Sequence, residues 1–498
     1  MRTIVWTVVF TAAVVAACTS DQQATAPRRV RFQNLTVSVD SDSANLASSD
    51  SQLVKGWGLD PGVGNNPFWH YQGPQAESLL YHMGLTFIRD QLDYALYDTG
   101  TTISNITLNS AQLTAYETKW DSAKVHGMGY MLSVWSPPAR FKDSIGLDGG
   151  KLDSTDGRPS FVAFMTVLLN HLNSSTVGLP KALSIANEPD KKANYPSTPY
   201  DTALWEETLD NSRGSFNFAG YSSMPTIGPE LSAFDSALTF LGDNSDTTID
   251  GGYFYHTALS AYAFHTYGDD DWSSLQSFIN NHKKDVWMTE YSQPLYQGNS
   301  QVAKAIDLMS ALGAHFEIIP TNYWAWWLGS AYADTDVQAN GSPGAGTLIL
   351  DDTLHNRLEV TSMFYTLRKL FQNVIPGSWR VQYVTSYYTK SAHPLRYTTS
   401  GQESSGQPRI DVYAFEETDS RKTVVVVSNW TNDDKRLTLI GLPTSYTTQQ
   451  GYVSDSASTN AELIAQSPST CWTPTGQSVA RTVLYAPHRG VLIAIMNP

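Results

Sequence analysis

Between residues 53 and 372, short apolar runs alternate with longer amphipathic stretches. The short runs are rich in β-branched and aromatic residues and are typical of buried strands. Eight of them are expected as strands, at residues 56–58, 85–89, 130–135, 182–186, 225–230, 261–265, 286–290 and 316–320. Apolar residues at helical spacing, such as Val302, Ile306 and Met309, occupy the stretches between them, and Gly313 is expected to end one helix. Eight strand–helix units predict a (β/α)8 barrel over 53–372.

After residue 372 the pattern changes to short strands separated by Gly, Ser, Asn and Asp turns, as at 411–415, 423–428 and 490–495. This pattern predicts an all-β domain over 373–498. One further alternating segment, residues 30–40, lies upstream of the barrel. Because an isolated strand is unstable, this segment must pair with a sheet formed elsewhere. We therefore expect a side β-sandwich built from the N-terminal strand and the C-terminal segment.

Residues 1–17 are expected to be a signal peptide of the lipoprotein type. Arg2 precedes an apolar run from Ile4 to Ala17, which is too short to span a membrane but suits a signal sequence. The run ends at Val15-Ala16-Ala17-Cys18, which resembles a bacterial lipobox and implies lipidation of Cys18. The alternative is an ordinary secretory signal followed by an incidental cysteine.

Residues 18–29 and 41–52 are rich in small polar residues, so we expect them to be a tether and a linker. The predicted location is that of an exported bacterial lipoprotein, at the outer membrane, the cell surface or in the periplasm; without the lipid the protein would be secreted. Lipidation of Cys18 would leave Cys471 without a disulfide partner, so no structural disulfide is predicted.

The composition of the chain excludes some classes of binding partner. The net charge of −15 argues against nucleic acid and against a basic membrane-binding surface, which leaves a lipid anchor as the expected membrane contact. Aromatic residues make up 12% of the chain, with 14 Trp and 26 Tyr, which suits either an aromatic-rich core or stacking against sugar rings. The sequence has no His-Glu-x-x-His pattern, no phosphate-loop glycines and no cysteine pair at metal spacing. We therefore expect no metal, no cofactor and a monomer.

Two glutamates stand at the ends of predicted strands. Glu188 lies in Ala-Asn-Glu-Pro-Asp after the fourth strand, and Glu290 lies in Trp-Met-Thr-Glu-Tyr at the seventh. In a (β/α)8 barrel the carboxyl ends of the strands carry the active site. Hydrolysis of a glycosidic bond needs one protonated and one ionised carboxyl group. The pair therefore predicts a glycoside hydrolase, whereas either glutamate alone could be a loop residue or part of an ion pair.

These and other motifs make the chain resemble family 30 of the retaining glycoside hydrolases. That family contains bacterial xylanases, fungal 1,6-galactanases and 1,6-glucanases, and lysosomal glucosylceramidase. The matching segments are Lys55-Gly56-Trp57-Gly58, Gly84-Leu85-Thr86-Phe87-Ile88-Arg89, Val134-Trp135-Ser136-Pro137-Pro138, Ala186-Asn187-Glu188-Pro189-Asp190, His265-Thr266-Tyr267-Gly268, Trp287-Met288-Thr289-Glu290-Tyr291, Tyr323-Trp324-Ala325-Trp326-Trp327 and Ile375-Pro376-Gly377-Ser378-Trp379-Arg380-Val381. The resemblance also implies a side β-sandwich fed by both termini and a reaction without a cofactor.

The resemblance implies roles for individual residues. Glu188 would be the general acid/base and Glu290 the nucleophile. A general acid is expected to have a raised pKa, and Arg89 on the second strand would keep the nucleophile ionised. Asn187 would bind the sugar 2-hydroxyl, and Tyr267 would hydrogen-bond the nucleophile unless it is a core residue.

Several aromatic and polar residues are further site candidates. Trp135 and one of Trp324 and Trp326 are expected to form the floor and wall for a sugar ring, with the barrel core as the alternative for at least one of them. His265 either lines the site or is a buried core histidine. Glu230, at the end of the fifth strand, is either a polar subsite group or a solvated side chain.

The expected reaction is a double displacement with retention, which requires carboxyl groups about 5–5.5 Å apart. The expected substrate is a β-linked polysaccharide cleaved internally, with xylan favoured. Family members that depend on a glucuronate branch carry an arginine after the eighth-strand tryptophans, where this chain has Leu328-Gly329-Ser330, so no strict dependence is expected. The alternatives are a β-1,6-galactanase or β-1,6-glucanase, an exo-acting or glucosylceramidase-like enzyme, and a polysaccharide-binding lipoprotein without catalysis.

Overall fold

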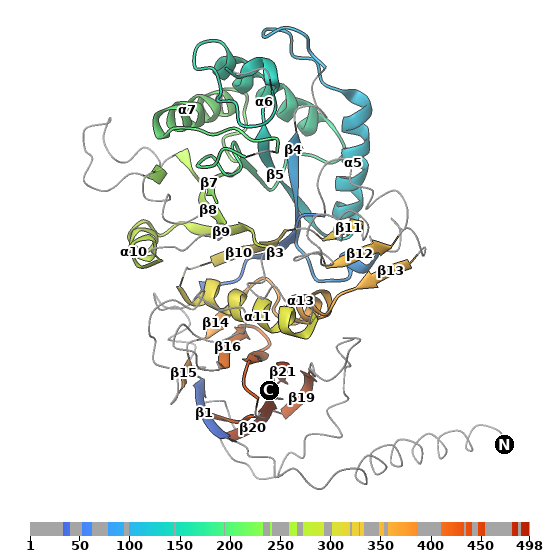
Figure 1. The fold of residues 1–498 in the computed structure, drawn as a ribbon, viewed down its shortest axis with the longest axis vertical. Coiled ribbons are helices and arrows are strands. Elements are labelled where there is room, and N and C mark those ends of the chain that lie inside the picture. The colour runs from blue at the N-terminus through green and yellow to red at the C-terminus, as the bar shows by residue number, and fades with distance from the viewer. Residues whose placement is uncertain are drawn as a thin grey trace, which may run out of the picture.

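The structure is a computed structural model of the 498-residue chain, and it divides into a barrel and a sandwich of sheets (Figure 1). The residues that it describes are 33–39, 52–61, 78–93, 99–143, 146–193, 195–232, 240–241, 258–265, 272–292, 301–318, 321–327, 329–332, 348–352, 357–381, 383–385, 410–432, 435–440, 447–453, 481–486 and 490–497.

The upper part of Figure 1 is a closed barrel of eight strands. In order around the ring they are β3 (Gly56–Leu59), β4 (Phe87–Asp93), β5 (Gly129–Ser136), β6 (Ala182–Ser184), β7 (Thr226–Leu231), β8 (Ala261–His265), β9 (Asp285–Glu290) and β10 (Thr321–Trp326). All neighbours pair in parallel, and β10 closes the ring by pairing with β3. The helices that follow these strands include α5 (Ser110–Val125), α6 (Gly157–Ser174), α7 (Thr202–Phe218), α10 (Trp272–His282), α11 (Gln301–Ile318) and α13 (Ser362–Asn373). The predicted (β/α)8 barrel is confirmed.

Side chains fill the inside of the barrel. The interior cluster consists of Phe87, Met131, Ala182, Ile227, Ala261, Ala263, Trp287 and Ala325. Gly58 makes room for Phe87, because a β-carbon at Gly58 would lie 2.2 Å from the phenyl ring. Since strand residues alternate between the two faces, their neighbours point outward to the helices. The barrel is therefore a packed core, and polar side chains gather at its carboxyl end.

The eighth strand lies later in the chain than the sequence predicted. The first seven predicted runs overlap barrel strands, but residues 316–318 form the last turn of α11, and the eighth strand is β10. Gly313 also lies inside α11 rather than at its end. A β-carbon at Gly313 would lie 2.5 Å from the ring of Tyr413, so glycine lets a sandwich strand pack against this helix. A short apolar run at the end of a buried helix cannot be told from a strand by periodicity alone.

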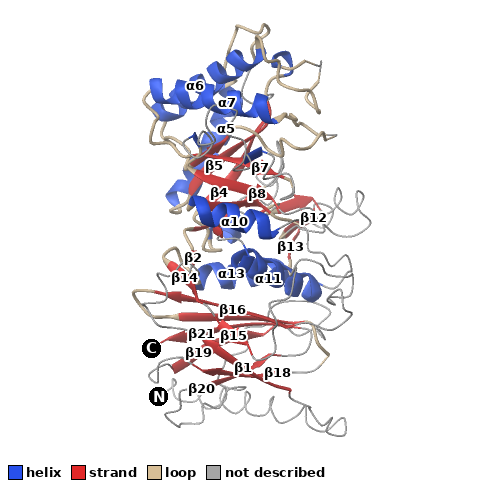
Figure 2. Ribbon diagram, turned by 90° about the vertical axis from the view of Figure 1, so that its left-hand side faces the viewer, coloured by secondary structure: helices blue, strands red, loops and turns tan. Residues whose placement is uncertain are grey.

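Two sheets form the lower part of the molecule, and Figure 2 shows them as layers. The six-stranded sheet has the order β19 (Thr447–Val453), β21 (Gly490–Asn497), β17 (Thr423–Asn429), β16 (Ile410–Glu417), β14 (Ser378–Val381) and β2 (Gln52–Leu53). The four-stranded sheet has the order β15 (Tyr383–Thr385), β1 (Gln33–Val39), β18 (Lys435–Ile440) and β20 (Arg481–Ala486). β1 pairs antiparallel with β15 and parallel with β18. The prediction that the N-terminal strand joins a C-terminal sandwich is confirmed.

The barrel and the sandwich share an apolar boundary. Helices α11 and α13 lie between the barrel and the six-stranded sheet (Figure 2). Trp57 on β3 stacks on Phe371 of α13 with ring centroids 4.6 Å apart, and it lies edge-on to Phe415 of β16 at 6.5 Å. A small sheet of β11 (Ser330–Tyr332), β12 (Ile349–Asp352) and β13 (Arg357–Val360) connects β10 to α13. Burial of these rings holds the two parts together.

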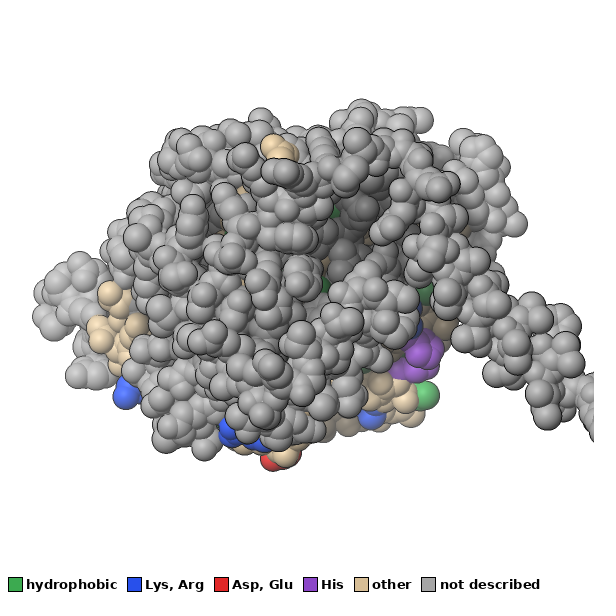
Figure 3. Space-filling view, turned by 90° about the horizontal axis from the view of Figure 1, so that it is seen from below, with side chains coloured by type: hydrophobic (Ala, Val, Ile, Leu, Met, Phe, Trp, Pro, Cys, Tyr) green, Lys and Arg blue, Asp and Glu red, His purple; other side chains and the backbone are tan. Residues whose placement is uncertain are grey.

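The surface at the sandwich end carries scattered polar side chains. In the view from below, the described side chains that can be seen are separate basic, acidic, histidine and polar groups, with hydrophobic atoms at isolated points (Figure 3). Within the described ranges, no helix combines the length and the apolar character that crossing a membrane requires. The predicted signal peptide, tether and Cys18 lie outside the described residues, so the predicted location stays a prediction.

Candidate active site

Glu188 and Glu230 lie at the carboxyl ends of neighbouring strands with left-handed backbones. Their φ angles are +45° and +53°. The Glu188 N–H donates to the Glu230 carbonyl at 2.9 Å, and the Asn187 N–H donates to the Val134 carbonyl at 2.7 Å. A non-glycine residue in this conformation costs about 1–3 kcal/mol, which the surrounding structure must offset. These backbone hydrogen bonds therefore hold the two glutamates in one arrangement.

The predicted pair of glutamates is brought together at this end of the barrel. Glu188, His265 and Glu290 each place one side-chain oxygen or nitrogen within 4.8 Å of the others. The side chains of Glu188 and Glu290 keep 5% and 8% of their surface exposed. These oxygens are closer together than the roughly 6.5–9.5 Å that separates the carboxyl groups of inverting enzymes, so the spacing suits retention of the anomeric configuration.

Arg89 is the central cation of the site, and its side chain is completely buried. Its Nη1 lies 3.0 Å from Glu290 Oε2 and 3.5 Å from Asp60 Oδ2. Its Nη2 donates to Asn187 Oδ1 at 2.6 Å and lies 3.3 Å from Glu230 Oε1. Arginine stays charged under all ordinary conditions, and its charge is one of the causes that lower the pKa of Glu230. The sequence predicted that Arg89 lies beside Glu290, and the structure places it there.

Glu230 is fully buried, so the solvated side chain that the sequence left open is excluded. Its Oε1 lies 3.3 Å from Arg89 Nη2, and its Oε2 accepts a hydrogen bond from the Ser133 hydroxyl. Burial by itself would raise the pKa of Glu230. The charges of Arg89 and His265 and the hydrogen bond from the Ser133 hydroxyl have the larger effect and lower this pKa to about 2. A side chain with no exposed surface cannot contact a sugar either, so Glu230 is not a polar subsite group. It can influence the reaction only through the residues that it contacts, Arg89, His265 and Ser133.

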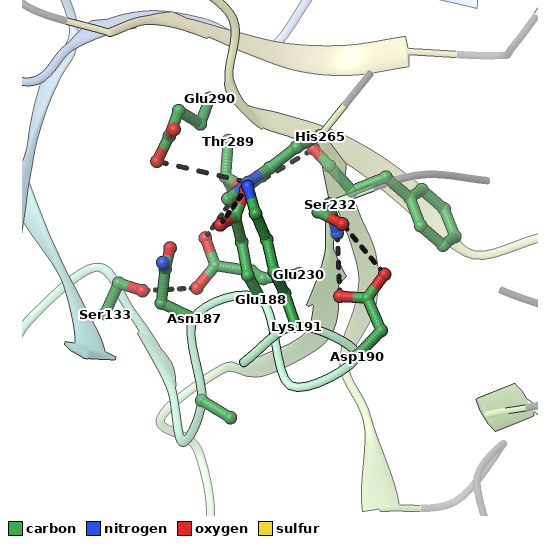
Figure 4. Close-up of polar contacts among 12 residues, drawn as sticks. Ser133, Asn187, Glu188, Asp190, Lys191, Glu230, Ser232, His265, Thr289 and Glu290 are labelled. Carbon is green, nitrogen blue, oxygen red and sulfur yellow. Dashed lines mark hydrogen bonds and ion pairs between the residues drawn. The ribbon is translucent and has the colours of Figure 1, made fainter. Parts of the chain in front are cut away.

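His265 lies among three carboxylates, as Figure 4 shows. Its Nδ1 is 3.3 Å from Glu188 Oε1 and 4.0 Å from Glu290 Oε2, and its Nε2 is 3.7 Å from Glu230 Oε1. Burial lowers the pKa of His265, but the charge of Glu290 and the contacts with Glu188 and Glu230 raise it overall to about 9. Of the two roles left open for His265, the structure favours a place in the site.

The structure corrects the expected pKa of Glu188. Burial raises this pKa, but the contact and charge of His265, the Tyr195 hydroxyl and the charge of Lys191 lower it to about 2. Lys191 Nζ lies 3.4 Å from Glu188 Oε2, and the Tyr195 hydroxyl donates to the same oxygen. The sequence predicted a raised pKa because it could not show that these donors surround the carboxylate.

An aromatic cluster lies beside Glu188. Trp135 stacks on Trp327 with ring centroids 5.3 Å apart and planes 21° from parallel, and it meets Tyr195 at 5.4 Å. Trp327 and Tyr195 are half-buried. The sequence reasoning named Trp135 but missed the other two. Trp327 directly follows β10, and only the register of that strand shows that it continues the face of Tyr323 and Ala325.

Trp324 and Trp326 lie on the opposite face of β10, so the prediction that one of them walls the sugar site is wrong. Both are fully buried among the outer helices. Trp324 Nε1 donates to His315 Nδ1 at 3.0 Å, and Trp326 packs edge-on against Tyr291 at 5.8 Å. A tryptophan needs an exposed face to stack on a sugar, and Trp327 has one where these two do not.

Several solved structures with the same architecture are those of glycan-degrading enzymes. A family 30 subfamily 8 xylanase from Clostridium acetobutylicum has a TM-score of 0.66 at 18% identity, over 93% of this chain and 100% of that chain. The chain has the fold of family 30 glycoside hydrolases. The catalytic domain of a family 30 xylanase from Talaromyces cellulolyticus has a TM-score of 0.66 at 15% identity, over 93% and 100% of the two chains. An endo-β-1,6-glucanase has a TM-score of 0.64 at 14% identity, over 93% and 94%. No family model and no curated protein sequence matches the chain.

Two of the predicted site residues lie outside the described residues. Tyr267 follows β8 and Cys18 ends the predicted signal peptide, and the structure describes neither. Their expected roles, a hydrogen bond to Glu290 and attachment of a lipid, stay predictions.

Glu188, His265 and Glu290 are also the one group among the described residues whose spacing could suit a metal ion. Charge opposes this use, because the Arg89 guanidinium lies 3.0 Å from Glu290. A histidine that carries protons on both nitrogens has no lone pair for a metal, and the raised pKa of His265 favours that form. The arrangement suits proton transfer and nucleophilic attack better than metal binding.

Proposed function

We propose that the protein is a retaining glycoside hydrolase that cleaves a β-linked polysaccharide internally. The observation that carries the proposal is the pair of carboxylates within 4.8 Å at the carboxyl end of the barrel. A water molecule cannot be placed between a sugar and a carboxylate at this separation as an inverting enzyme requires, whereas a direct attack by one carboxylate fits it.

The surroundings divide the roles between the two glutamates. Glu290 contacts the permanent charge of Arg89, which suits a nucleophile that must remain ionised. Glu188 contacts His265 and Tyr195, two groups that can exchange protons with it. We assign Glu290 as the nucleophile and Glu188 as the general acid/base.

In the first displacement, Glu290 attacks the anomeric carbon while Glu188 gives a proton to the departing glycosidic oxygen. In the second, Glu188 takes a proton from water, and that water cleaves the glycosyl–Glu290 ester with a second inversion. Arg89 accepts no proton in either step, but it fixes Asn187 by donating to its Oδ1. We assign Asn187 Nδ2 as the donor to the sugar 2-hydroxyl.

For the substrate, we propose a xylan-type chain without strict dependence on a glucuronate branch. The aromatic cluster of Trp135, Trp327 and Tyr195 offers apolar surface beside the acid, as sugar faces require. Two of the structural neighbours named above are xylanases and the third is an endo-β-1,6-glucanase. A β-1,6-glucan or β-1,6-galactan is the second candidate for the same site.

We also propose that a lipid on Cys18 attaches the enzyme to a membrane. The predicted tether leads into β1, which belongs to the four-stranded sheet at the end of the molecule away from the barrel (Figure 1). An anchor there would leave the barrel on the far side of the sandwich, where a polymer can reach it.

Two measurements test the proposed function. Reducing-sugar release from xylan, glucuronoxylan, β-1,6-glucan and β-1,6-galactan should show internal cleavage of one of them, with oligomers as early products. Proton NMR during hydrolysis should show the β-anomer first. An initial α-product would refute retention, monosaccharide alone would indicate exo action, and binding without any release would favour a polysaccharide-binding lipoprotein.

A further inference from the structure

We propose that, before the substrate binds, His265 holds the proton that Glu188 later delivers to the leaving group, and that Glu230 keeps it there. This inference rests on the proposed function and explains how a site with an ionised acid residue can act as an acid. In this reading Glu230 is a positioning residue, since it is fully buried and cannot touch the substrate.

The position of the imidazole ring supports a doubly protonated His265. Its Nδ1 faces Glu188 Oε1 at 3.3 Å, and its Nε2 faces Glu230 Oε1 at 3.7 Å. A neutral imidazole has one N–H and one lone pair, so one ring nitrogen would turn its lone pair toward a carboxylate. An imidazolium directs an N–H at each carboxylate, and burial strengthens this electrostatic interaction.

The partners of Glu188 support its ionised form. While Oε1 faces the ring, Oε2 accepts from the Tyr195 hydroxyl and lies 3.4 Å from Lys191 Nζ. An ammonium group can only donate, so Oε2 of Glu188 acts as an acceptor. The pKa values agree in direction, since that of His265 is raised to about 9 and that of Glu188 is lowered to about 2.

Charges on the other strands also act on the ring. Glu290 on β9 places Oε2 4.0 Å from Nδ1, and Arg89 on β4 binds both Glu290 and Glu230. Asp60, after β3, lies behind Arg89 at 3.5 Å. Three carboxylates face the ring, whereas the Arg89 guanidinium and the Lys191 ammonium are paired with carboxylates, so the balance favours a proton on His265.

The proton transfer balances without any other reactant. The Nδ1–H bond of His265 breaks as an O–H bond forms on Glu188, which leaves a neutral imidazole and a carboxylic acid. Glu188 passes a proton to the glycosidic oxygen while Glu290 attacks. In the second displacement Glu188 takes a proton from water and returns it to Nδ1. Through both steps Nε2 keeps its proton, because Glu230 faces it.

Nitrogen-15 NMR of the histidine-labelled full chain tests where the proton resides. A His265→Gln variant assigns the signal, and His315 is an internal control, because burial lowers its pKa to about 3 and it should be neutral. At pH 7 we expect both nitrogens of His265 to be protonated, with a titration midpoint near 9. A neutral His265 in the wild-type protein at pH 7 would overturn the proposal.

The role of Glu230 is tested in Glu230→Gln, which keeps the shape but removes the charge. We expect the His265 midpoint to fall by about one pH unit or more, and the alkaline limb of kcat/KM to move down with it. An unmoved midpoint in the folded variant would refute the role of Glu230. If this variant does not fold, Glu230→Asp, which keeps the charge but draws the carboxylate away from Nε2, should give a smaller shift in the same direction.

The outcomes separate this inference from the proposed function. The NMR measurement needs no substrate. A protonated His265 in a protein that cleaves no glycan would therefore refute the hydrolase proposal but not the location of the proton. An active, retaining enzyme whose His265 is neutral at pH 7 would refute the proposed location of the proton and leave the hydrolase proposal intact.

Discussion

Arg89 Nη1 lies 3.0 Å from Glu290 Oε2, and the arginine is completely buried whereas the glutamate keeps 8% of its side chain exposed. A permanent charge therefore holds Glu290 from the inside of the barrel and leaves it accessible from the outside. Glu188 lies beside the partly exposed Lys191 and contacts Tyr195 and His265, which can exchange protons with it. This difference between two chemically identical side chains is the basis of the assigned roles.

Replacing Glu290 with Gln should lower the rate of hydrolysis by several orders of magnitude, because an amide is a poor nucleophile. The variant should stay folded, since the two side chains have the same shape. Reducing-sugar release and thermal melting would measure both effects. Glu207→Gln on the exposed face of α7 is the matched control and should keep full activity. Near-wild-type activity in Glu290→Gln would show that the nucleophile is another residue.

Replacing Glu188 with Ala should slow cleavage of the polysaccharide by about 10²–10⁴-fold, the usual contribution of a general acid/base. An aryl glycoside with a good leaving group needs no protonation, so its first step should be affected much less. Added azide should restore turnover and give a product of retained configuration. Equal losses on both substrates, without azide rescue, would argue against this role.

Replacing Arg89 with Met should destabilise the protein by about 3–5 kcal/mol, because it removes a buried counter-charge from Glu230, Glu290 and Asp60. The loss should be complete above pH 4.5 and should shrink as the pH falls toward 2, since the pKa of Glu230 is lowered from 4.5 to about 2 by folding. Urea unfolding across this pH range would measure it.

Arg158→Met is the control for this loss. Arg158 pairs with Glu207, whose side chain is 60% exposed, so its removal should cost less than about 1 kcal/mol. Equal costs for the two variants would contradict the idea that the buried charges depend on Arg89.

Trp327 and Trp324 should respond in opposite ways to truncation. Trp327→Ala should raise KM for the polysaccharide and leave the unfolding free energy nearly unchanged, because Trp327 is half-buried beside Trp135. Trp324→Ala should cost about 3–5 kcal/mol of stability, since it leaves a cavity under α11. Initial rates and urea unfolding of both variants would distinguish them. A large rise in KM for a folded Trp324→Ala variant would instead support the prediction from the sequence that Trp324 lines the sugar site.

Replacing Cys18 with Ala should release the protein from the membrane fraction of the bacteria that produce it. Detergent phase partitioning and incorporation of labelled palmitate would measure the change. Cys471→Ala is the matched control, because it should remain lipidated and membrane-bound. If both variants and the wild-type protein are equally water-soluble, the signal is an ordinary secretory one.

Much of the fold could be predicted because it depends on local patterns. Each barrel strand before β10 overlaps an apolar run that can be seen in the sequence, and alternation alone identified β1 as a strand in need of partners. The prediction failed at residues 316–318, where a buried helix end has the same apolar composition as a strand. Packing of α11 against the sandwich, which the sequence does not show, decided that segment.

The aromatic part of the site could be predicted only in part. Trp135 lies near the end of an apolar strand and was identified, whereas Tyr195 lies in a loop with no periodic pattern. Three tryptophans within four positions, Trp324, Trp326 and Trp327, could not be ranked without the register of β10. A shift of one residue moves a side chain to the other face of a strand.

The sequence by itself determined that two glutamates stand at the ends of strands four and seven of a barrel, because runs of apolar residues and their order in the chain are local facts. Only the tertiary structure decided which charged and polar groups surround these glutamates. His265, Arg89 and Tyr195 come from separate strands and loops, and each lowers the pKa of Glu188 or Glu230 only because it lies within a few ångströms. Electrostatic interactions depend on distance in space and on burial, and neither can be seen in the order of residues along the chain.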